Sequence, residues 1–154
     1  MNRNTRRVTL LVSGLALCAV LQAQGPPAKT MEEKKSIAQS QHEVLALLID
    51  KGEYGKVPGG LQKILDLNFT GKYEQSVVDE ILILSDLLTK KSQLNVALKL
   101  VEMGQAGLKE KESHARLYKE QGFLYKLLGQ PEKALEMFEK GRALEAGSSG
   151  KPSP

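Results

Sequence analysis

Between Ala115 and Gly141 the chain alternates small and large side chains at helical spacing, and this segment constrains the fold more than any other. Residues four and three positions apart share one face of an α-helix. Two such triplets occur, Tyr118, Gly122 and Tyr125 first, and then Ala134, Phe138 and Gly141. Small residues allow two antiparallel helices to approach closely, and aromatic rings fill the space around that contact. The segment therefore predicts a tight helical hairpin.

The residues between the two triplets favour a turn. Gly129 can adopt the left-handed backbone conformation that ends many helices. Pro131 suits the first position of a helix, where its missing N–H would have no partner. Glu132 places a carboxylate at the positive end of the helix dipole. The second helix is therefore expected to begin at Pro131.

With these residues the segment resembles a tetratricopeptide repeat, a helix-turn-helix unit of about 34 residues that stacks with copies of itself. The resemblance is clearest over residues 115–146. Three positions depart from the usual pattern, because Gln121, Gly141 and Ala146 stand where an apolar residue, an alanine and a proline are usual. The resemblance implies a protein that binds other proteins and rarely performs chemistry.

A weaker form of the pattern recurs upstream at an offset of 37 residues. The columns that share this offset are Gly60, Ala97 and Ala134; Leu61, Leu98 and Leu135; Ile64, Val101 and Phe138; Val44, Ile81 and Tyr118; and the turn residues Gly55, Ser92 and Gly129. The first two copies are degenerate: Leu48 and Ser85 stand where Gly122 does, and Lys51 and Leu88 where Tyr125 does. Three repeats, near residues 41–69, 78–105 and 115–146, are one interpretation. A single repeat on a generic all-helical domain is the other.

Apolar residues recur at helical intervals over residues 31–146, which predicts an all-α domain of six helices in three antiparallel hairpins. The resemblance implies that the hairpins stack as a tetratricopeptide-like, right-handed α-solenoid. Helices are expected over residues 31–51, 58–67, 73–88 and 93–103, followed by a polar connection over 105–111 and the hairpin of 115–146. Ser40 and Glu43 either form a capping box that breaks the first helix or lie within it.

The last helix has two interpretations at its outer face. Its exposed side is expected to carry Lys133, Glu136, Glu139 and Lys140. These charges favour a face that is solvated without a further cap helix. The alternative is that this end of the stack docks on a partner.

Residues 1–23 have the features of a bacterial secretory signal peptide. Arg3, Arg6 and Arg7 precede an apolar run over residues 8–21, which is shorter than the ~20 residues that a membrane-spanning helix needs. Cleavage is expected after Ala23. Residues 24–30 would then form a flexible leader, and residues 147–154, rich in Gly, Ser and Pro, a disordered tail. The expected protein is exported, periplasmic or secreted, with no membrane span after cleavage.

Cys18 is the only cysteine, and it permits a second interpretation of this segment. Lipidation of Cys18 would make the protein a lipid-anchored envelope-assembly subunit of the same fold. Leu17 fits this poorly, because lipoprotein processing needs a small residue just before the cysteine. If cleavage instead follows Ala23, the mature chain has no thiol and cannot form a disulfide.

The positive net charge of the chain belongs largely to the same segment. Residues 1–23 hold three of the 22 Lys and Arg residues and none of the 18 acidic ones, so without them the net charge falls from +4 to +1. A nearly neutral domain with interspersed signs has no electrostatic footprint for nucleic acid. Nucleic acid is therefore not expected as a partner.

The sequence offers no catalytic, metal-binding or cofactor-binding set, so we expect a protein that is not an enzyme and needs no cofactor. His42 and His114 lie on different predicted helices, whereas a zinc site needs about four ligands close together. Glu110 and His114 are four residues apart, which is typical of a surface pair on a helix. No glycine-rich phosphate loop follows a strand. A hydrolytic or metal-dependent enzyme is a remote alternative.

The resemblance also implies where a protein or peptide partner would bind, because the first helices of such repeats line the concave face of the stack. Transferred at the offset of 37, this predicted groove comprises His42, Leu45, Ile49, Asp79, Leu82, Asp86, Arg116, Lys119, Phe123 and Leu127. It would be apolar at its floor, acidic in the middle and basic in the third repeat, which suits an extended peptide or a partner helix. Some family members hold a terminal carboxylate with paired Lys and Asn, but Ile49 and Phe123 stand where that clamp needs Asn.

Overall fold

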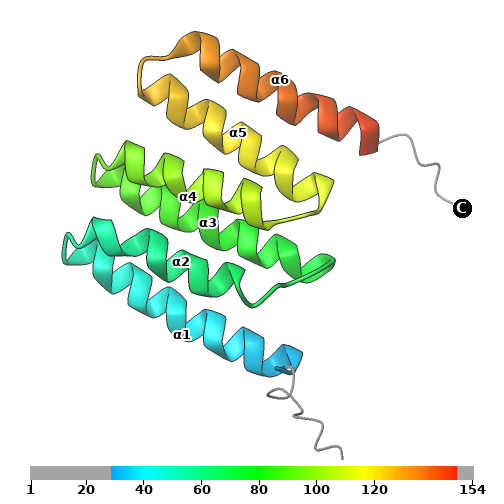
Figure 1. Cartoon of the computed structure of the whole chain (residues 1–154). Coiled ribbons are helices and arrows are strands. Elements are labelled where there is room, and N and C mark those ends of the chain that lie inside the picture. The colour runs from blue at the N-terminus through cyan, green and yellow to red at the C-terminus, as the bar shows by residue number, and fades with distance from the viewer. Residues whose placement is uncertain (1–28, 149–154) are drawn as a thin grey trace, which may run out of the picture.

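The computed structural model describes residues 29–148, and this part of the chain is all-helical, without a strand (Figure 1). It contains six α-helices and one short 3-10 helix: α1 (Met31–Asp50), η1 (Tyr54–Lys56), α2 (Val57–Leu65), α3 (Lys72–Lys90), α4 (Leu94–Gly107), α5 (Lys111–Leu127) and α6 (Pro131–Ser148). The prediction of an all-α domain with six helices is confirmed. The expected signal peptide with Cys18, the leader up to residue 28 and the tail from residue 149 lie outside the described residues.

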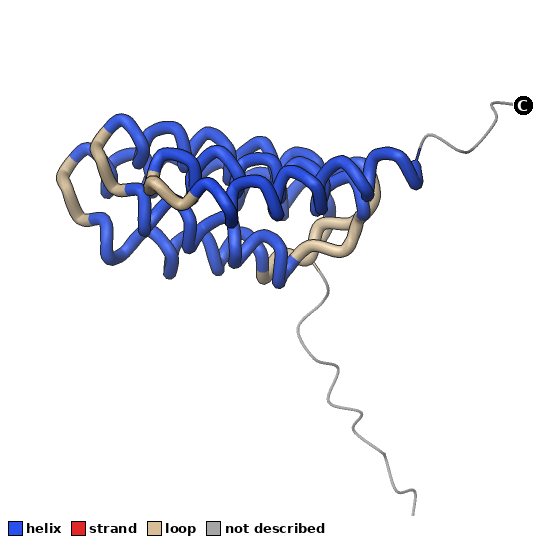
Figure 2. The backbone as a smooth tube through the Cα atoms, turned by 90° about the horizontal axis from the view of Figure 1, so that it is seen from above, coloured by secondary structure: helices blue, strands red, loops and turns tan. Residues whose placement is uncertain are grey.

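The helices pair in chain order. α1 packs against α2, α3 against α4 and α5 against α6, and the three pairs follow one another so that α3 also contacts α1 and α5 (Figure 1). The short hairpin turns gather at one end of the helices, and the α2–α3 and α4–α5 connections gather at the other (Figure 2). The first helices of the pairs, α1, α3 and α5, therefore lie next to one another in sequence order.

The three hairpin turns use the same backbone device. Each first helix is followed by a residue with positive φ, namely Gly52 (75°), Ser92 (60°) and Gly129 (71°). In each, the next N–H closes a six-residue ring: Glu53 donates to Leu48 O, Gln93 to Leu88 O and Gln130 to Tyr125 O, at 2.8, 2.8 and 2.9 Å. This is the Schellman motif, which satisfies carbonyls that the end of a helix would leave free. These turns give an internal measure of which residues are equivalent between the pairs.

The first turn is placed differently from the prediction. Gly52, and not Gly55, has the left-handed conformation, so 40 residues separate the first turn from the second and 37 separate the second from the third. The three additional residues form η1, after which α2 returns to the offset of 37. Consistent with this, the expected small residues of the second helices, Gly60, Ala97 and Ala134, are all buried.

Within α1 the register is therefore shifted by three residues from the prediction. Leu45, not Leu48, is equivalent to Ser85 and Gly122, and all three are buried. The predicted column of Val44, Ile81 and Tyr118 is wrong in its first member, since Val44 is 47% exposed whereas Ile81 is fully buried. The physical reason is that a short 3-10 turn absorbs an insertion without disturbing either helix that it joins.

The helix ends differ from prediction where capping decides them. The capping box of α1 is formed by Thr30 and Glu33: the Glu33 N–H donates to Thr30 Oγ1 (3.2 Å) and the Thr30 N–H donates to Glu33 Oε2 (2.7 Å). Ser40 lies inside an unbroken helix. α4 continues past Met103 to Gly107, and α6 includes Gly147 and Ser148, where the tail was expected to begin.

Glycines mark the closest contacts between helices. A methyl group at Gly104 of α4 would lie 2.6 Å from Ile81 Cδ1 and 3.0 Å from Leu117 Cδ1, so α4 approaches both α3 and α5 over this glycine. Gly122 of α5 is covered in the same way by the ring of Phe138. One cluster of buried aliphatic side chains runs from Leu45 in α1 to Leu124 in α5. The core is therefore shared between pairs and not divided among them.

The start of α5 depends on a buried carboxylate of α3. Glu74 is 1% exposed, and its Oε1 accepts hydrogen bonds from the backbone N–H groups of Lys109 (3.0 Å) and Glu110 (2.8 Å). α5 has no side-chain cap of its own. Glu74 therefore supplies from the preceding pair the acceptor that the α4–α5 connection, residues 108–110, needs.

Candidate functional site

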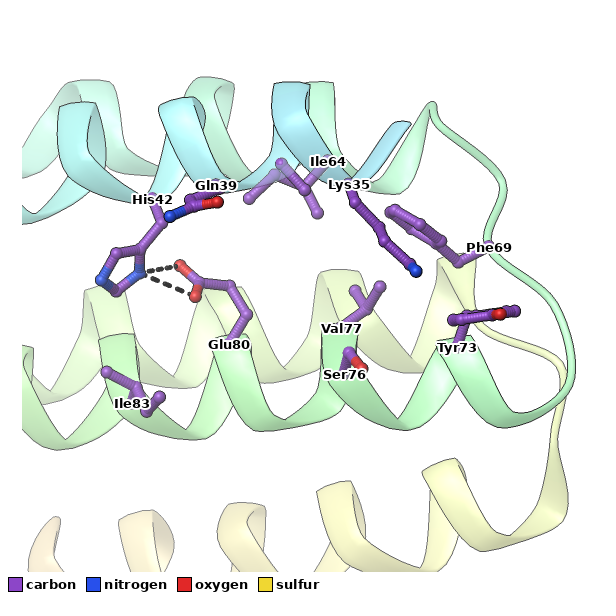
Figure 3. Close-up of a pocket in the computed structure, with 11 residues that line it drawn as sticks. Lys35, Gln39, His42, Ile64, Phe69, Tyr73, Ser76, Val77, Glu80 and Ile83 are labelled. Carbon is purple, nitrogen blue, oxygen red and sulfur yellow. Dashed lines mark hydrogen bonds and ion pairs between the residues drawn. The ribbon is translucent and has the colours of Figure 1, made fainter. Parts of the chain in front are cut away.

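A pocket of about 490 Å³ opens between α1 and α3, beside the α2–α3 connection (Figure 3). Its lining residues are Lys35, Ala38, Gln39, His42, Ile64, Phe69, Tyr73, Ser76, Val77, Glu80 and Ile83. We call this cavity the α1–α3 pocket. The carbon side chains among them form its floor and walls, while the polar side chains approach from both helices. Such a combination of apolar lining and few polar groups is typical of ligand sites in proteins.

One end of the pocket is closed by a contact between its two helices. His42 Nδ1 lies 2.9 Å from Glu80 Oε1 and 2.8 Å from Oε2 (Figure 3). Both side chains are partly buried. With Nδ1 protonated, the imidazole donates to the carboxylate, and Nε2 is left for a second interaction. The pair thus fixes the spacing of α1 and α3 and presents a ring nitrogen that is not used by Glu80.

The other end of the pocket is aromatic and cationic. Lys35 Nζ lies 5.1 Å from the centroid of the Tyr73 ring, and its side chain extends towards Phe69 and Tyr73 (Figure 3). A hydrogen bond to Glu32 (2.8 Å) holds the pKa of the Lys35 ammonium above its ordinary value. The lysine is therefore charged at neutral pH. A ligand carboxylate at this end would meet a fixed positive charge beside an aromatic ring.

At the next junction along the stack, Arg116 links the two first helices. Arg116 of α5 donates to Gln75 Oε1 (3.0 Å) and to Asp79 Oδ1 (2.6 Å) of α3. By the turn equivalences, Gln75 and Asp79 correspond to Lys35 and Gln39 of α1, and Arg116 corresponds to Asp79. At the α1–α3 junction the residue equivalent to Arg116 is therefore Asp79, which has a short acidic side chain and is itself bound by Arg116.

Two residues of the predicted groove are misplaced. Leu45 is fully buried and Ile49 is 1% exposed, and both belong to the central aliphatic cluster. They cannot line an accessible surface in this structure. The cause is the three-residue shift of α1, which turns these positions towards α2 and places Gln39, His42 and Ala46 where Asp79, Leu82 and Asp86 lie in α3.

The other eight predicted residues lie on the first helices without forming one continuous site. Among the described residues, His42 alone of the ten lines the α1–α3 pocket, and Leu82 is partly buried against the core. Four are held in three surface pairs, Asp79 with Arg116, Asp86 with Lys90 and Lys119 with Glu145. Phe123 and Leu127 are more than half exposed at the far end of α5.

A second hollow, of about 510 Å³, lies on α5 and α6, at the C-terminal end of the stack. It is lined by Lys119, Phe123, Leu135, Phe138, Glu139, Arg142 and Glu145, and we call this surface the end face. The rings of Phe123 and Phe138 meet edge to face, with centroids 5.1 Å apart. The predicted charged residues Lys133, Glu136, Glu139 and Lys140 are exposed, but apolar side chains share the outer surface with them.

Sequence reasoning missed most of the α1–α3 pocket. The offset of 37 residues placed other residues of α3 in the predicted groove, and so missed Ser76, Glu80 and Ile83. Lys35 was missed because it precedes the first expected repeat. A detectable signal did exist, since Gly52 is followed by Glu53 as Ser92 is by Gln93 and Gly129 by Gln130. Aligning these turns would have placed Gln39 and His42 correctly.

Within residues 29–148, no group of three or more His, Cys, Asp and Glu side chains is arranged to hold a metal ion. Over the same range, no helix combines the length and apolarity that crossing a membrane requires. No family model, curated protein or solved structure matches the chain.

Proposed function

We propose that this protein is a non-enzymatic adaptor of the tetratricopeptide class, which binds an extended segment of another protein across its first helices. The observation that carries the proposal is the α1–α3 pocket, which lies between two such helices and is apolar inside and polar at its rim. The motif residues of 115–146 and the three equivalent turns support the class. A stack of helical pairs with a continuous core suits this use, because it presents a rigid and extended surface.

The pocket chemistry favours a peptide that carries one apolar side chain with a carboxylate nearby. Ile64, Val77 and Ile83 would contact the apolar group, and Lys35 would meet the carboxylate. Gln39 and Ser76 supply donors and acceptors for the peptide backbone. Peptide recognition of this kind combines a few pockets for side chains with hydrogen bonds to the main chain.

Selection from a random peptide library displayed on phage, with the purified protein as bait, tests the proposal. Enriched peptides should share an apolar residue. Their dissociation constants, measured by fluorescence anisotropy, should rise about tenfold or more in the Ile83→Glu variant, because a carboxylate in the apolar wall is poorly solvated. Ile83 is 49% exposed, so this substitution should leave the fold intact.

Leu135→Glu is the matched control for that experiment. Leu135 is also exposed and apolar, but it lies on the end face and not in the pocket. Selected peptides should bind this variant as they bind the wild type. The absence of any enriched peptide, or equal binding to the Ile83→Glu variant and the wild type, would contradict the assignment of the pocket.

The proposal extends to location. The basic and apolar pattern of residues 1–23 supports an exported adaptor that acts in the periplasm or outside the cell. The alternative is a lipid-anchored envelope-assembly subunit of the same fold, attached through Cys18. Catalysis has no supporting observation among the described residues, and a hydrolytic or metal-dependent enzyme stays the remote alternative.

A further inference from the structure

We propose that copies of this protein associate head to tail, with α1 of one copy seated on the end face of the next. This surface is separate from the α1–α3 pocket, so the inference goes beyond the proposed function. It depends on exposed apolar side chains on α1 and on the end face, and α1 and α6 lie at opposite ends of the stack (Figure 1). It also depends on the equivalence of these surfaces to ones that pack on each other inside the chain.

The first surface is an apolar stripe on α1. Ile37, Val44 and Leu47 are spaced by seven and three residues and share one face of the helix. They are 37, 47 and 58% exposed, although they are large aliphatic side chains. We call them the α1 stripe. No helix among the described residues covers it.

The equivalent residues of α3 and α5 are covered by the preceding pair. At the turn-based offsets, Val44 corresponds to Leu84, which is fully buried, and to Gln121, which is 6% exposed and accepts a hydrogen bond from Gln105 of α4 (3.0 Å). Ile37 corresponds to Val77, which is 3% exposed at the junction with α1. The α1 stripe is thus equivalent to the side of α3 and α5 that packs on the preceding pair of helices.

The second surface is the end face, which is equivalent to the surfaces of the first two pairs on which the next first helix packs. Phe138 corresponds to Val101 and Ile64, which are 0 and 2% exposed and belong to the central aliphatic cluster. Leu135, at 60% exposure, corresponds to Leu98 and Leu61, which pack in the core cluster. The hollow of about 510 Å³ on the end face is therefore the position that the first helix of a following pair would occupy.

A second copy is the occupant that both surfaces favour together. The α1 stripe lies at one end of the chain and the end face at the other. Their residues are equivalent to those that pack on each other at the α1–α3 and α3–α5 junctions. In this register Lys119, which pairs with Glu145 of its own chain, would lie opposite Ser40 of the next copy. Lys119 on the end face corresponds to His42, and Ser40 beside the α1 stripe corresponds to Glu80, which is the partner of His42. Such a heterologous contact builds an open chain, or a ring where its rotation closes.

Sedimentation velocity over a range of protein concentrations tests the proposal. The wild type should sediment faster as its concentration rises. Leu47→Glu blocks the α1 stripe and Leu135→Glu blocks the end face, so each variant alone should be monomeric, with its dissociation constant raised more than about tenfold. An equimolar mixture of the two should give a 1:1 dimer, because each supplies the surface that the other lacks.

The outcomes are distinct. A wild type that stays monomeric at all concentrations, or a mixture of the two variants that stays monomeric, overturns the proposal. Self-association of Leu47→Glu alone also overturns it, since that result would indicate contact between two end faces. Ile83→Glu is the control that should associate like the wild type. Circular dichroism of each variant verifies that its helices are intact.

A gain of association provides an independent measurement. Ser40→Glu would place a carboxylate opposite Lys119 of the next copy, in the position of Glu80 opposite His42. The association constant should rise about two- to fivefold at low salt, which is the range for an exposed ion pair. Adding Lys119→Ala should remove this rise. An association constant unaffected by Ser40→Glu contradicts the proposed register.

Discussion

Gly122 of α5 lies directly under the ring of Phe138 of α6, and the two residues share a space that holds only one side chain. A methyl group at Gly122 would lie 2.7, 2.8 and 2.9 Å from three carbons of that ring. The ring also meets Phe123 edge to face. The contact between a small and a large motif residue thus sets the approach of the last two helices, as their spacing in the sequence predicts.

Gly122→Ala should therefore destabilise the protein, although alanine is the better helix former. Overpacking of a tight contact costs about 1–3 kcal/mol, which opposes a gain in helix propensity of about 1 kcal/mol. We expect a lower free energy of unfolding in urea. Adding Phe138→Leu should restore part of the loss, because the smaller side chain can make room for the methyl group.

Gly59→Ala is the matched control for this prediction. Gly59 lies in α2 with no heavy atom of another residue within 4 Å of the added methyl group. Its substitution should leave the free energy of unfolding unchanged or raise it by up to about 1 kcal/mol. A destabilisation equal to that of Gly122→Ala would mean that the contact with Phe138 is not the cause.

The buried carboxylate of Glu74 gives a second prediction. Glu74→Ala removes the acceptor of the Lys109 and Glu110 N–H groups, and an unsatisfied polar group of this kind costs about 1–3 kcal/mol. Hydrogen exchange should be faster at these two amides and in the first turn of α5. Glu102→Ala, at an exposed position of α4, should change the free energy of unfolding by less than about 0.5 kcal/mol.

The start of α1 should depend on pH through Glu33. The backbone hydrogen bond from Thr30 lowers the pKa of the Glu33 carboxyl below its ordinary value of 4.5. A lowered pKa in the folded state means that the carboxylate stabilises the fold above pH 4.5, and that this contribution is lost as the pH falls through the lowered value. Carbon NMR titration of the Glu33 carboxyl should show the lowered pKa directly.

Two variants separate the capping box from other acid effects. Thr30→Pro, which removes the backbone N–H that donates to Glu33 and suits the φ of −65° at this position, should return the Glu33 pKa towards 4.5 and weaken the first turn of α1. Glu33→Gln should make the helix content of that turn less dependent on pH in the same range. If the Glu33 pKa were unchanged by Thr30→Pro, the backbone hydrogen bond would not be its cause.

Processing of residues 1–23 can be measured on protein from bacterial cell fractions. Cleavage after Ala23 predicts an N-terminal sequence that begins Gln24-Gly25-Pro26 in the periplasmic or secreted fraction. The Cys18→Ser variant should be processed in the same way. Incorporation of labelled palmitate that disappears in this variant would instead support the lipid-anchored alternative.

The sequence by itself determined the six helices and the turns at Ser92 and Gly129, because these depend on local properties. The spacing of Tyr118, Gly122 and Phe138 predicts a hairpin, and the start of α6 at Pro131 follows from the geometry of proline alone. The small residues of the second helices were also found, since α2, α4 and α6 keep one offset. Binding of a protein or peptide by the predicted groove stays a prediction.

Only the tertiary structure decided the register of α1 and the composition of the α1–α3 pocket. Three residues inserted after Gly52 form η1 and shift the register of α1. Leu45 and Ile49 therefore lie in the core and not in the groove. Glu80 faces His42 across 38 residues of sequence because α3 packs on α1. Burial and cross-helix pairing depend on which faces meet in space, and a local periodicity does not contain that information.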